Sequence, residues 1–191
     1  MKVGLFFGSF NPIHTGHMII ANTIFEYSGL NEIWFVVSPQ NPDKRDSKSL
    51  IHEFDRMDMV ELAIEDHPHF KAVDIEFRMP KPNFTIDTLS YLQDRYPDDQ
   101  FSLIIGEDNL SSFTRWKNYK LILDQYGLIV YPRPNSKESG VKDHPNVKLV
   151  EAPRMDISAS FIRKCIRENK SVRYLVPEKV YQFILDRKLY V

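Results

Sequence analysis

Short apolar runs recur along this chain, and segments of helical spacing lie between them. A run of four or five apolar residues bounded by turn residues is typical of a strand buried on both faces of a sheet. Residues 70–77 instead alternate apolar and polar side chains, which favours a strand toward a sheet edge. Together the patterns predict strands at residues 3–7, 33–37, 70–77, 101–105, 128–131 and 147–151.

Helices are predicted between these strands, because apolar residues there return every three or four positions. Gly29 and Gly127 follow two of these segments and are typical helix ends. The predicted helices cover residues 18–27, 50–65, 85–96, 119–126 and 180–189. Alternating strands and helices indicate an α/β fold with a doubly wound parallel sheet. The 191 residues suit a single domain over 1–191, with the helices from about residue 158 packing on the sheet.

Composition narrows the classes of partner. The formal net charge is −1, from 25 basic and 26 acidic residues, so no overall basic surface points to nucleic acid or a membrane. The single cysteine, Cys165, rules out an internal disulfide and is expected to be a packing residue. The chain shows no segment typical of a signal peptide or a membrane span, and we expect a cytoplasmic protein.

The most informative stretch is G-S-F-N-P-I-H-T-G-H at residues 8–17, directly after the first predicted strand. It places His14 and His17 near the start of a helix, where free backbone N–H groups and the helix dipole favour an anion. Gly8 and Gly16 leave room for a ligand close to the backbone. Two plainer interpretations exist: a metal site, for which nearby ligands beyond the two histidines are missing, and an ordinary surface loop.

A second stretch, D-I-S-A-S-F-I-R at residues 156–163, combines hydroxyls with a guanidinium. Ser158 is a natural helix N-cap, Ser160 lies in the first turn, and Arg163 follows about one turn later. Hydroxyls, N–H groups and an arginine at one helix start would grip a triphosphate. Alone this pattern is weak, because serine caps and helical arginines are common.

Polar residues between these two stretches follow other predicted strands, where ligands of open α/β sheets bind. Lys44 and Arg45 belong to a polar loop, 38–49, that is either plain surface or a lid over phosphates. Asp108 follows a strand end and would hold a ribose or a magnesium-bound water, or cap the next helix. Trp116, between Arg115 and Lys117, would stack on a flat ring or simply pack.

The two stretches together resemble the motifs of nucleotidyltransferases of the H-x-G-H type, over residues 3 to about 165. The closest pattern is that of the bacterial nicotinate-nucleotide adenylyltransferases, with Ser9 where a second glycine is common. The segments around T-I-D-T-L (residues 85–89), I-G-x-D and Trp116 also resemble that family. The resemblance implies a Rossmann-like nucleotidyltransferase fold and transfer of AMP from ATP to nicotinate mononucleotide, in NAD biosynthesis.

The resemblance also implies roles for individual residues. The catalytic residues would be His14, His17 and Arg163, with Mg²⁺ bound together with ATP and no protein metal site. ATP would be bound by Gly8, Ser9, Phe10, Gly16, His17, Gly106, Asp108, Ile157, Ser158, Ser160 and Arg163. The mononucleotide would be bound by Asn11, Lys44, Thr85, Thr88, Trp116 and Arg133.

Several alternatives stay open at this point. Nicotinamide mononucleotide and phosphopantetheine are rival acceptors, although phosphopantetheine enzymes usually have threonine where this chain has His14. A non-catalytic nucleotide-binding module would not need His14, His17 and Arg163, and a metal-dependent hydrolase would need further ligands. Members of the superfamily form monomers and larger assemblies, so the resemblance sets no oligomeric state.

Overall fold

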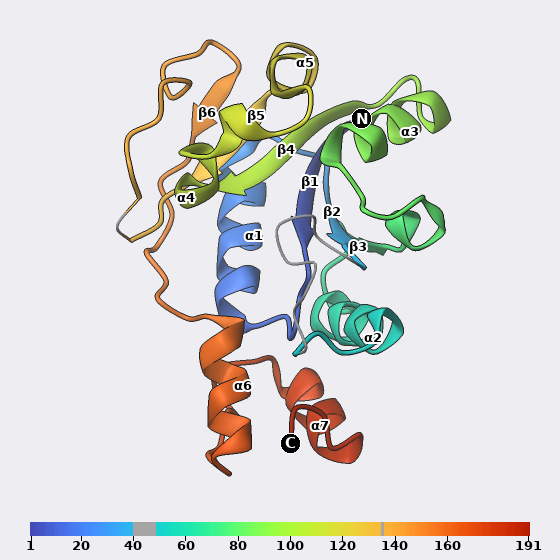
Figure 1. Cartoon of the computed structure of the whole chain (residues 1–191), viewed down its shortest axis with the longest axis vertical. Coiled ribbons are helices and arrows are strands. Elements are labelled where there is room, and N and C mark those ends of the chain that lie inside the picture. Colours follow the sequence, from blue (N-terminus) through green and yellow to red (C-terminus); the bar gives the residue numbers. More distant parts are fainter. Residues whose placement is uncertain (40–48, 135) are drawn as a thin grey trace.

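A computed structural model describes residues 1–39, 49–134 and 136–191, and it contains one six-stranded, all-parallel sheet (Figure 1). The strand order is β3-β2-β1-β4-β5-β6. The chain adds strands on one side of β1 up to β3 and on the other side from β4 onward, so the strand order reverses at β1. This is the order of a doubly wound fold, in which ligands bind beyond the carboxyl ends of the strands beside the reversal point. The strands are β1 (Lys2–Gly8), β2 (Glu32–Val37), β3 (Phe70–Val73), β4 (Gln100–Gly106), β5 (Leu128–Tyr131) and β6 (Val147–Leu149).

The predicted alternation of strands and helices is confirmed, with boundaries shifted by a few residues. Gly29 and Gly127 both have positive φ, at +69° and +71°, and end helices as expected. The helices are α1 (Thr15–Ser28), α2 (Glu53–Ile64), α3 (Thr85–Arg95), α4 (Glu107–Leu110), α5 (Tyr119–Gln125), α6 (Ala159–Arg167) and α7 (Glu178–Asp186). Within the described ranges, no helix is long and apolar enough to cross a membrane.

The prediction of a strand over 70–77 is wrong in its second half. The strand ends at Val73, and Ile75–Arg78 form a 3₁₀ helix instead. Glu76 of this 3₁₀ helix is buried, and its carboxyl group accepts a hydrogen bond from Thr88 of α3 at 2.8 Å. The segment after Val73 is therefore tied to a neighbouring helix by a side-chain hydrogen bond and does not continue along the sheet.

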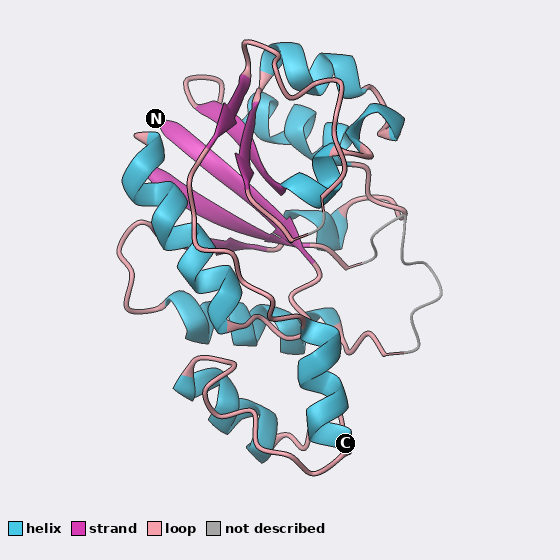
Figure 2. Cartoon of the chain, turned by 90° about the vertical axis from the view of Figure 1, so that its left-hand side faces the viewer, coloured by secondary structure: helices cyan, strands magenta, loops and turns pink. Residues whose placement is uncertain are grey.

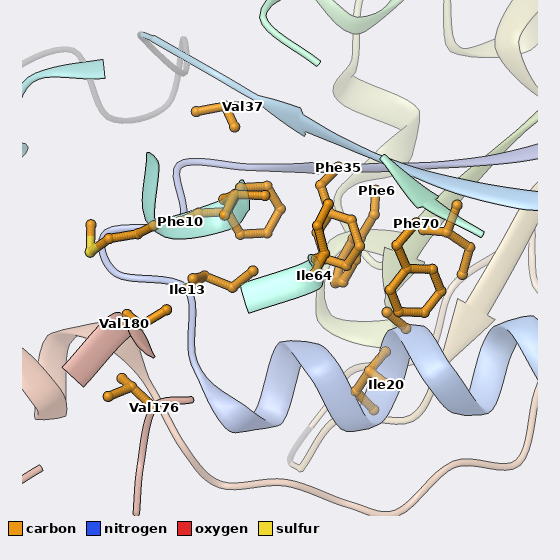
Figure 3. Close-up of a cluster of buried hydrophobic side chains, with 14 of the residues drawn as sticks. Phe6, Phe10, Ile13, Ile20, Phe35, Val37, Ile64, Phe70, Val176 and Val180 are labelled. Carbon is orange, nitrogen blue, oxygen red and sulfur yellow. The ribbon is translucent and has the colours of Figure 1, made fainter. Parts of the chain in front are cut away.

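Two buried clusters cover the two faces of the sheet. Strand residues alternate between them, since Phe6 and Phe35 face α1 and α2 whereas Leu5 and Trp34 face α3 and α5. Figure 3 shows the first cluster, in which Ile13, from the loop after β1, lies close to Val180 of α7.

The C-terminal helices α6 and α7 lie beyond the end of the sheet at which β1 runs into α1 (Figures 1 and 2). Ile162 of α6 and Val180 of α7 belong to the cluster on the α1–α2 face, and α2 is the main neighbour of α7. These helices thus border the carboxyl end of β1 instead of lying flat on the strands. Cys165 is buried in the same cluster.

Candidate active site at the carboxyl end of the sheet

The loop between β1 and α1, residues 8–17, is called the histidine loop here. Helix α1 begins at Thr15, three residues before the predicted start, so His14 is its N-cap residue and His17 lies in its first turn. The Thr15 N–H donates to the Leu175 carbonyl at 3.0 Å, which ties the helix start to the segment before α7. Both imidazoles therefore stand at the positive end of the α1 dipole, as the sequence predicted.

The two imidazoles form a stacked pair, with ring centroids 3.7 Å apart and planes inclined by 27°. The His14 backbone N–H donates to His17 Nδ1 at 3.2 Å. When Nδ1 is an acceptor, the proton of a neutral imidazole resides on Nε2, so this bond fixes the tautomer of His17. His17 thereby has an Nε2–H that can donate to a phosphate oxygen.

His14 is only 4% exposed, and Nδ1 of its ring has no hydrogen-bond partner among the described residues. Burial, followed by the positive charge of Arg133, lowers the pKa of His14 from 6.5 to about 4. At neutral pH this imidazole is therefore uncharged in the free protein. An anionic ligand beside it would favour the protonated ring.

The space left by the loop glycines is filled by side chains of the same loop. A Cβ at Gly8 would lie 2.8 Å from the Phe10 ring, and one at Gly16 would lie 3.1 Å from His14 Nδ1. Phe10 itself has φ +45°, in the left-handed region that non-glycine residues rarely adopt. Both glycines therefore permit the tight packing of the loop, and Gly8 also borders the cavity described below.

Arg56 of α2 holds the backbone of the histidine loop in place, a role that the sequence did not reveal. Its guanidinium is fully buried and donates to the carbonyl of Ser9 at 2.6 Å and to that of Ser38 at 2.7 Å. It also donates to the carbonyls of Pro39 and Ile51. The loops after β1 and β2 are thus joined by one cation whose donors match several carbonyl groups.

Asn11 is a second hub of the histidine loop. Its side-chain Nδ2 donates to the Ser49 carbonyl at 2.8 Å, and its Oδ1 accepts from the Tyr190 hydroxyl at 2.9 Å and from the Ile51 N–H at 3.4 Å. The amide of Asn11 is therefore engaged within the protein. These bonds use one of the two N–H groups of Nδ2, and the predicted contact of Asn11 with the mononucleotide remains a prediction.

The second sequence motif forms the start of α6. Ser158 is the N-cap residue, as predicted, and its hydroxyl accepts from the Phe161 N–H at 3.2 Å. Arg163 donates to the Asn11 carbonyl at 2.7 Å and to the Ser160 hydroxyl at 3.3 Å. Ile157 lies with His14 and Gly16 around a small cavity. The two motifs, about 150 residues apart in the sequence, are therefore adjacent in space.

Arg133 belongs to the same group of residues, rather than with Trp116 as expected. It lines the small cavity with His14 and His17, and its Nε lies 3.9 Å from Asp108 Oδ1. The strand β5 ends beside the histidine loop, so Arg133, two residues after the strand end, lines the same cavity as the imidazoles. Gly106 packs closely here, because an added Cβ would displace the exposed Asp108 carboxylate and lie 3.1 Å from Arg133 Cγ. Asp108 itself is exposed and does not cap α4, whose N-cap residue is Gly106.

A cavity of about 190 Å³ opens on the other side of Gly8 and Gly106. Thr85 and Trp116, which the sequence predicts to bind the mononucleotide, both line this cavity, and so does Arg115. We call this space the aromatic cavity; its lining includes Gly8, Ser38, Glu76, Asn83, Phe84, Thr85, Gly106, Arg115, Trp116 and Tyr131.

Two walls of the aromatic cavity suit a flat anionic ring. Trp116 is half-buried, packs on Phe113 with ring centroids 5.4 Å apart, and borders the cavity, so packing and stacking are compatible roles. Helix α3 begins at Thr85 after the N-cap Phe84, and no side chain of the described residues caps it. Its first backbone N–H groups are thus available for a carboxylate or another acceptor.

Thr88 does not line the aromatic cavity. It is fully buried, and its hydroxyl donates to Glu76 Oε1 at 2.8 Å. Burial raises the pKa of Glu76, and hydrogen bonds from Thr88 and Ser38 partly offset this rise. No sign of a special role for Glu76 is visible in the sequence, because a polar residue is expected at every second position of an alternating strand. Lys44, the remaining predicted site residue, lies outside the described residues.

The sequence is similar to a known family and to named bacterial proteins. The family model described as cytidylyltransferase-like matches residues 5–165. A protein of Cytophaga hutchinsonii named "probable nicotinate-nucleotide adenylyltransferase" is 58% identical over 190 residues, covering 100% of this chain and 98% of its own. A protein of the same name from Bacteroides thetaiotaomicron is 42% identical over 97% of this chain and 92% of its own.

Solved structures support the fold. The Plasmodium falciparum nicotinic acid mononucleotide adenylyltransferase complexed with NaAD superimposes with a TM-score of 0.82, over 99% of this chain and 97% of its own, at 20% identity. A second structure of that protein, complexed with APC, gives a TM-score of 0.81 over 99% of this chain and 96% of its own, also at 20% identity. At this identity the likeness concerns the arrangement of strands and helices.

Proposed function

This chain belongs to the cytidylyltransferase-like family, and from that premise we propose that it is a nicotinate-nucleotide adenylyltransferase. It transfers AMP from ATP to nicotinate mononucleotide and releases pyrophosphate. The observation that carries the proposal is the stacked His14–His17 pair at the start of α1, between the α6 arginine and an aromatic cavity. An adenylyltransferase needs a triphosphate site and an acceptor pocket side by side, and both candidates lie at the carboxyl end of the sheet.

The reaction requires positioning and charge stabilisation rather than a nucleophilic side chain. A phosphate oxygen of the acceptor attacks the α-phosphorus of ATP in line, and pyrophosphate leaves. Negative charge grows on the bridging oxygen and on the α-phosphate as this happens. His17 Nε2–H is the donor best placed for that charge, because the His14 N–H holds its ring and tautomer.

The residues around α6 would hold the leaving pyrophosphate. Arg163 uses donors of both Nη atoms within the protein, whereas its Nε has no partner among the described residues. A guanidinium has five N–H donors, so several remain for phosphate oxygens. Arg133, beside His14, adds a second positive charge at the same end. The Ser158 and Ser160 hydroxyls lie at the α6 start, although each already accepts one hydrogen bond.

Magnesium would enter together with ATP. Among the described residues, no three His, Cys, Asp or Glu side chains come together as a metal site. Mg²⁺ is usually held by substrate phosphates and water together with one or two carboxylates, and the exposed Asp108 near Arg133 suits that role. The ion would neutralise charge on the triphosphate.

The aromatic cavity would receive the pyridine mononucleotide. Trp116 offers a stacking surface, while Arg115 and the first N–H groups of α3 offer partners for the nicotinate carboxylate. Thr88 acts on this cavity only through Glu76, so we assign it a structural role in place of direct binding. We also propose a cytoplasmic location for the protein.

The decisive experiment is a pyrophosphate-release assay with ATP, Mg²⁺ and three separate acceptors. Nicotinate mononucleotide should be used at least about tenfold better than nicotinamide mononucleotide, since one buried carboxylate contact is worth roughly 1.5–3 kcal/mol. Phosphopantetheine should give no turnover. Equal use of nicotinate mononucleotide and nicotinamide mononucleotide would argue against the proposed carboxylate contact. No turnover with any acceptor would contradict the proposed adenylyltransferase activity.

A further inference from the structure

The segment after α7 reaches back to the histidine loop through a single polar side chain. Two residues with positive φ, Lys188 at +49° and Tyr190 at +67°, turn the chain after the helix. Such backbone conformations are rare for residues with side chains and persist where the surroundings hold them in place. Here they bring the Tyr190 hydroxyl to 2.9 Å from Asn11 Oδ1.

Asn11 connects this tyrosine to the phosphate-binding arginine. Its side chain accepts from Tyr190, while its backbone carbonyl accepts from Arg163 Nη1 at 2.7 Å. The same residue is fixed to the segment before α2 through the Ser49 carbonyl and the Ile51 N–H. Asn11 is 5% exposed, so water is poorly placed to replace any of these partners.

Tyr190 acts in this network as a neutral donor. Its ring packs against the cluster on the α1–α2 face, and burial raises the pKa of its phenol well above the usual range. The positive charges of Arg163 and Arg56 are close enough to oppose that rise. The phenol thus keeps its proton at physiological pH and offers it to Asn11, so it is unsuited to acid–base chemistry.

We infer that Tyr190 is a positioning residue for the ATP site: its bond to Asn11 sets the carbonyl against which Arg163 is aligned. Among the described residues, removing the hydroxyl would leave Asn11 Oδ1 with the longer bond from Ile51, at 3.4 Å. The loop carbonyl could then shift, and the free donors of Arg163 would shift with it. The aromatic cavity has its own walls and does not include Asn11, Arg163 or Tyr190. The inference rests on the proposed function only in taking Arg163 as an ATP contact.

The test compares Tyr190→Phe, which keeps the ring and removes one oxygen, with Tyr174→Phe, whose parent tyrosine is 88% exposed. Calorimetric titration with ATP and Mg²⁺, without acceptor, should show a three- to tenfold higher Kd for Tyr190→Phe, as expected for one hydrogen bond. The kcat/KM for ATP should fall to the same extent, while the KM for the mononucleotide should change less than twofold. Tyr174→Phe should match the wild type throughout.

A double-mutant cycle distinguishes positioning from general loosening of the fold. In an Arg163→Lys background, Tyr190→Phe should change the Kd for ATP by less than twofold, because the aligned group is absent. Measurements at 10 °C, with folding verified by circular dichroism, keep any loss of stability from mimicking the effect. Unchanged ATP binding in Tyr190→Phe, or an undiminished effect in the Arg163→Lys background, would overturn the inference. A wild-type protein that binds ATP but uses no pyridine mononucleotide would instead contradict the proposed function alone.

Discussion

The histidine loop and the aromatic cavity lie on either side of Gly8 and are built in different ways. The backbone of the histidine loop is held by hydrogen bonds: its carbonyls accept from Arg56 and Arg163, and its Thr15 N–H donates to the segment before α7. The walls of the aromatic cavity are held by side chains, through the packing of Trp116 on Phe113 and the hydrogen bond from Thr88 to Glu76. The first region holds its donors through hydrogen bonds to the backbone, whereas the second provides a shaped surface.

This difference matches what each substrate demands. Stabilising charge in a transition state requires donors at fixed positions, which backbone hydrogen bonds provide. Selecting a flat ring requires area and one or two polar contacts, which an aromatic wall and a helix start provide. Changes in the histidine loop should therefore affect turnover and ATP, and changes in the aromatic cavity should affect the acceptor.

The largest effect is expected for His17→Ala. Losing one donor to a transition-state oxygen typically lowers kcat about 10²- to 10³-fold. His69→Ala is the matched control, since that histidine is exposed and distant in the chain from the site. Steady-state kinetics together with circular dichroism measure the effect. Near-normal turnover in folded His17→Ala would remove this histidine from the mechanism.

Acidification should destabilise the protein through His14. The folded-state pKa of His14, about 4, is below the unfolded value of 6.5, so the unfolded chain binds more protons between these pH values. The free energy of unfolding should thus fall as the pH drops from 6.5 to 4, by up to about 3 kcal/mol. Urea unfolding at several pH values, with His14→Asn for comparison, tests this. An equally steep decline in both proteins would exclude His14 as the cause.

Trp116→Ala should raise the KM for the mononucleotide about 10- to 100-fold, on the scale of base–aromatic stacking. The KM for ATP should change less than threefold, because Trp116 lies in the aromatic cavity and apart from the histidine loop. Trp116→Phe keeps a smaller ring and should recover part of the loss. An equal rise in the KM values for ATP and for the mononucleotide would show that the histidine loop and the aromatic cavity do not bind their substrates independently.

The smallest effect is expected for Glu76→Gln. Because burial raises the pKa of Glu76, the folded protein binds more protons than the unfolded chain above pH 4.5, and stability falls as the pH rises there. The glutamine keeps an acceptor for Thr88 and removes the charge. Its free energy of unfolding at pH 7 should be higher by on the order of 1 kcal/mol. A lower value would mean that the ionised carboxylate is stabilised in the fold.

Local signals in the sequence were sufficient for much of this architecture. The glycines after α1 and α5 and the serine that caps α6 act within a few residues, so their effect can be predicted from neighbours alone. The strands are buried on both faces, which makes them continuous apolar runs. The histidine pair was also predicted, because strand, turn and helix start follow one another directly.

Long-range contacts explain the residues that were missed or misplaced. Arg56 looks like an exposed position of an amphipathic helix until the carbonyls of Ser9 and Ser38 surround it. Arg133 was expected near Trp116, but the end of β5 lies beside His14. Glu76 required its partner Thr88 on another element. Each case depends on which segments meet in space, and periodicity along the chain carries no such information.

The bond between Asn11 and Tyr190 joins residues 179 positions apart, and this has a consequence for protein synthesis. The first strand and helix can form soon after they leave the ribosome, because they need only nearby residues. The histidine loop gains Tyr190 as a partner only after all of the chain between Asn11 and Tyr190 has been made. Contacts of this separation form late in folding, since the loop that they close is long. A ribosome-bound chain halted before Tyr190 would therefore carry a formed sheet, but its histidine loop would lack the hydrogen bond from Tyr190 to Asn11.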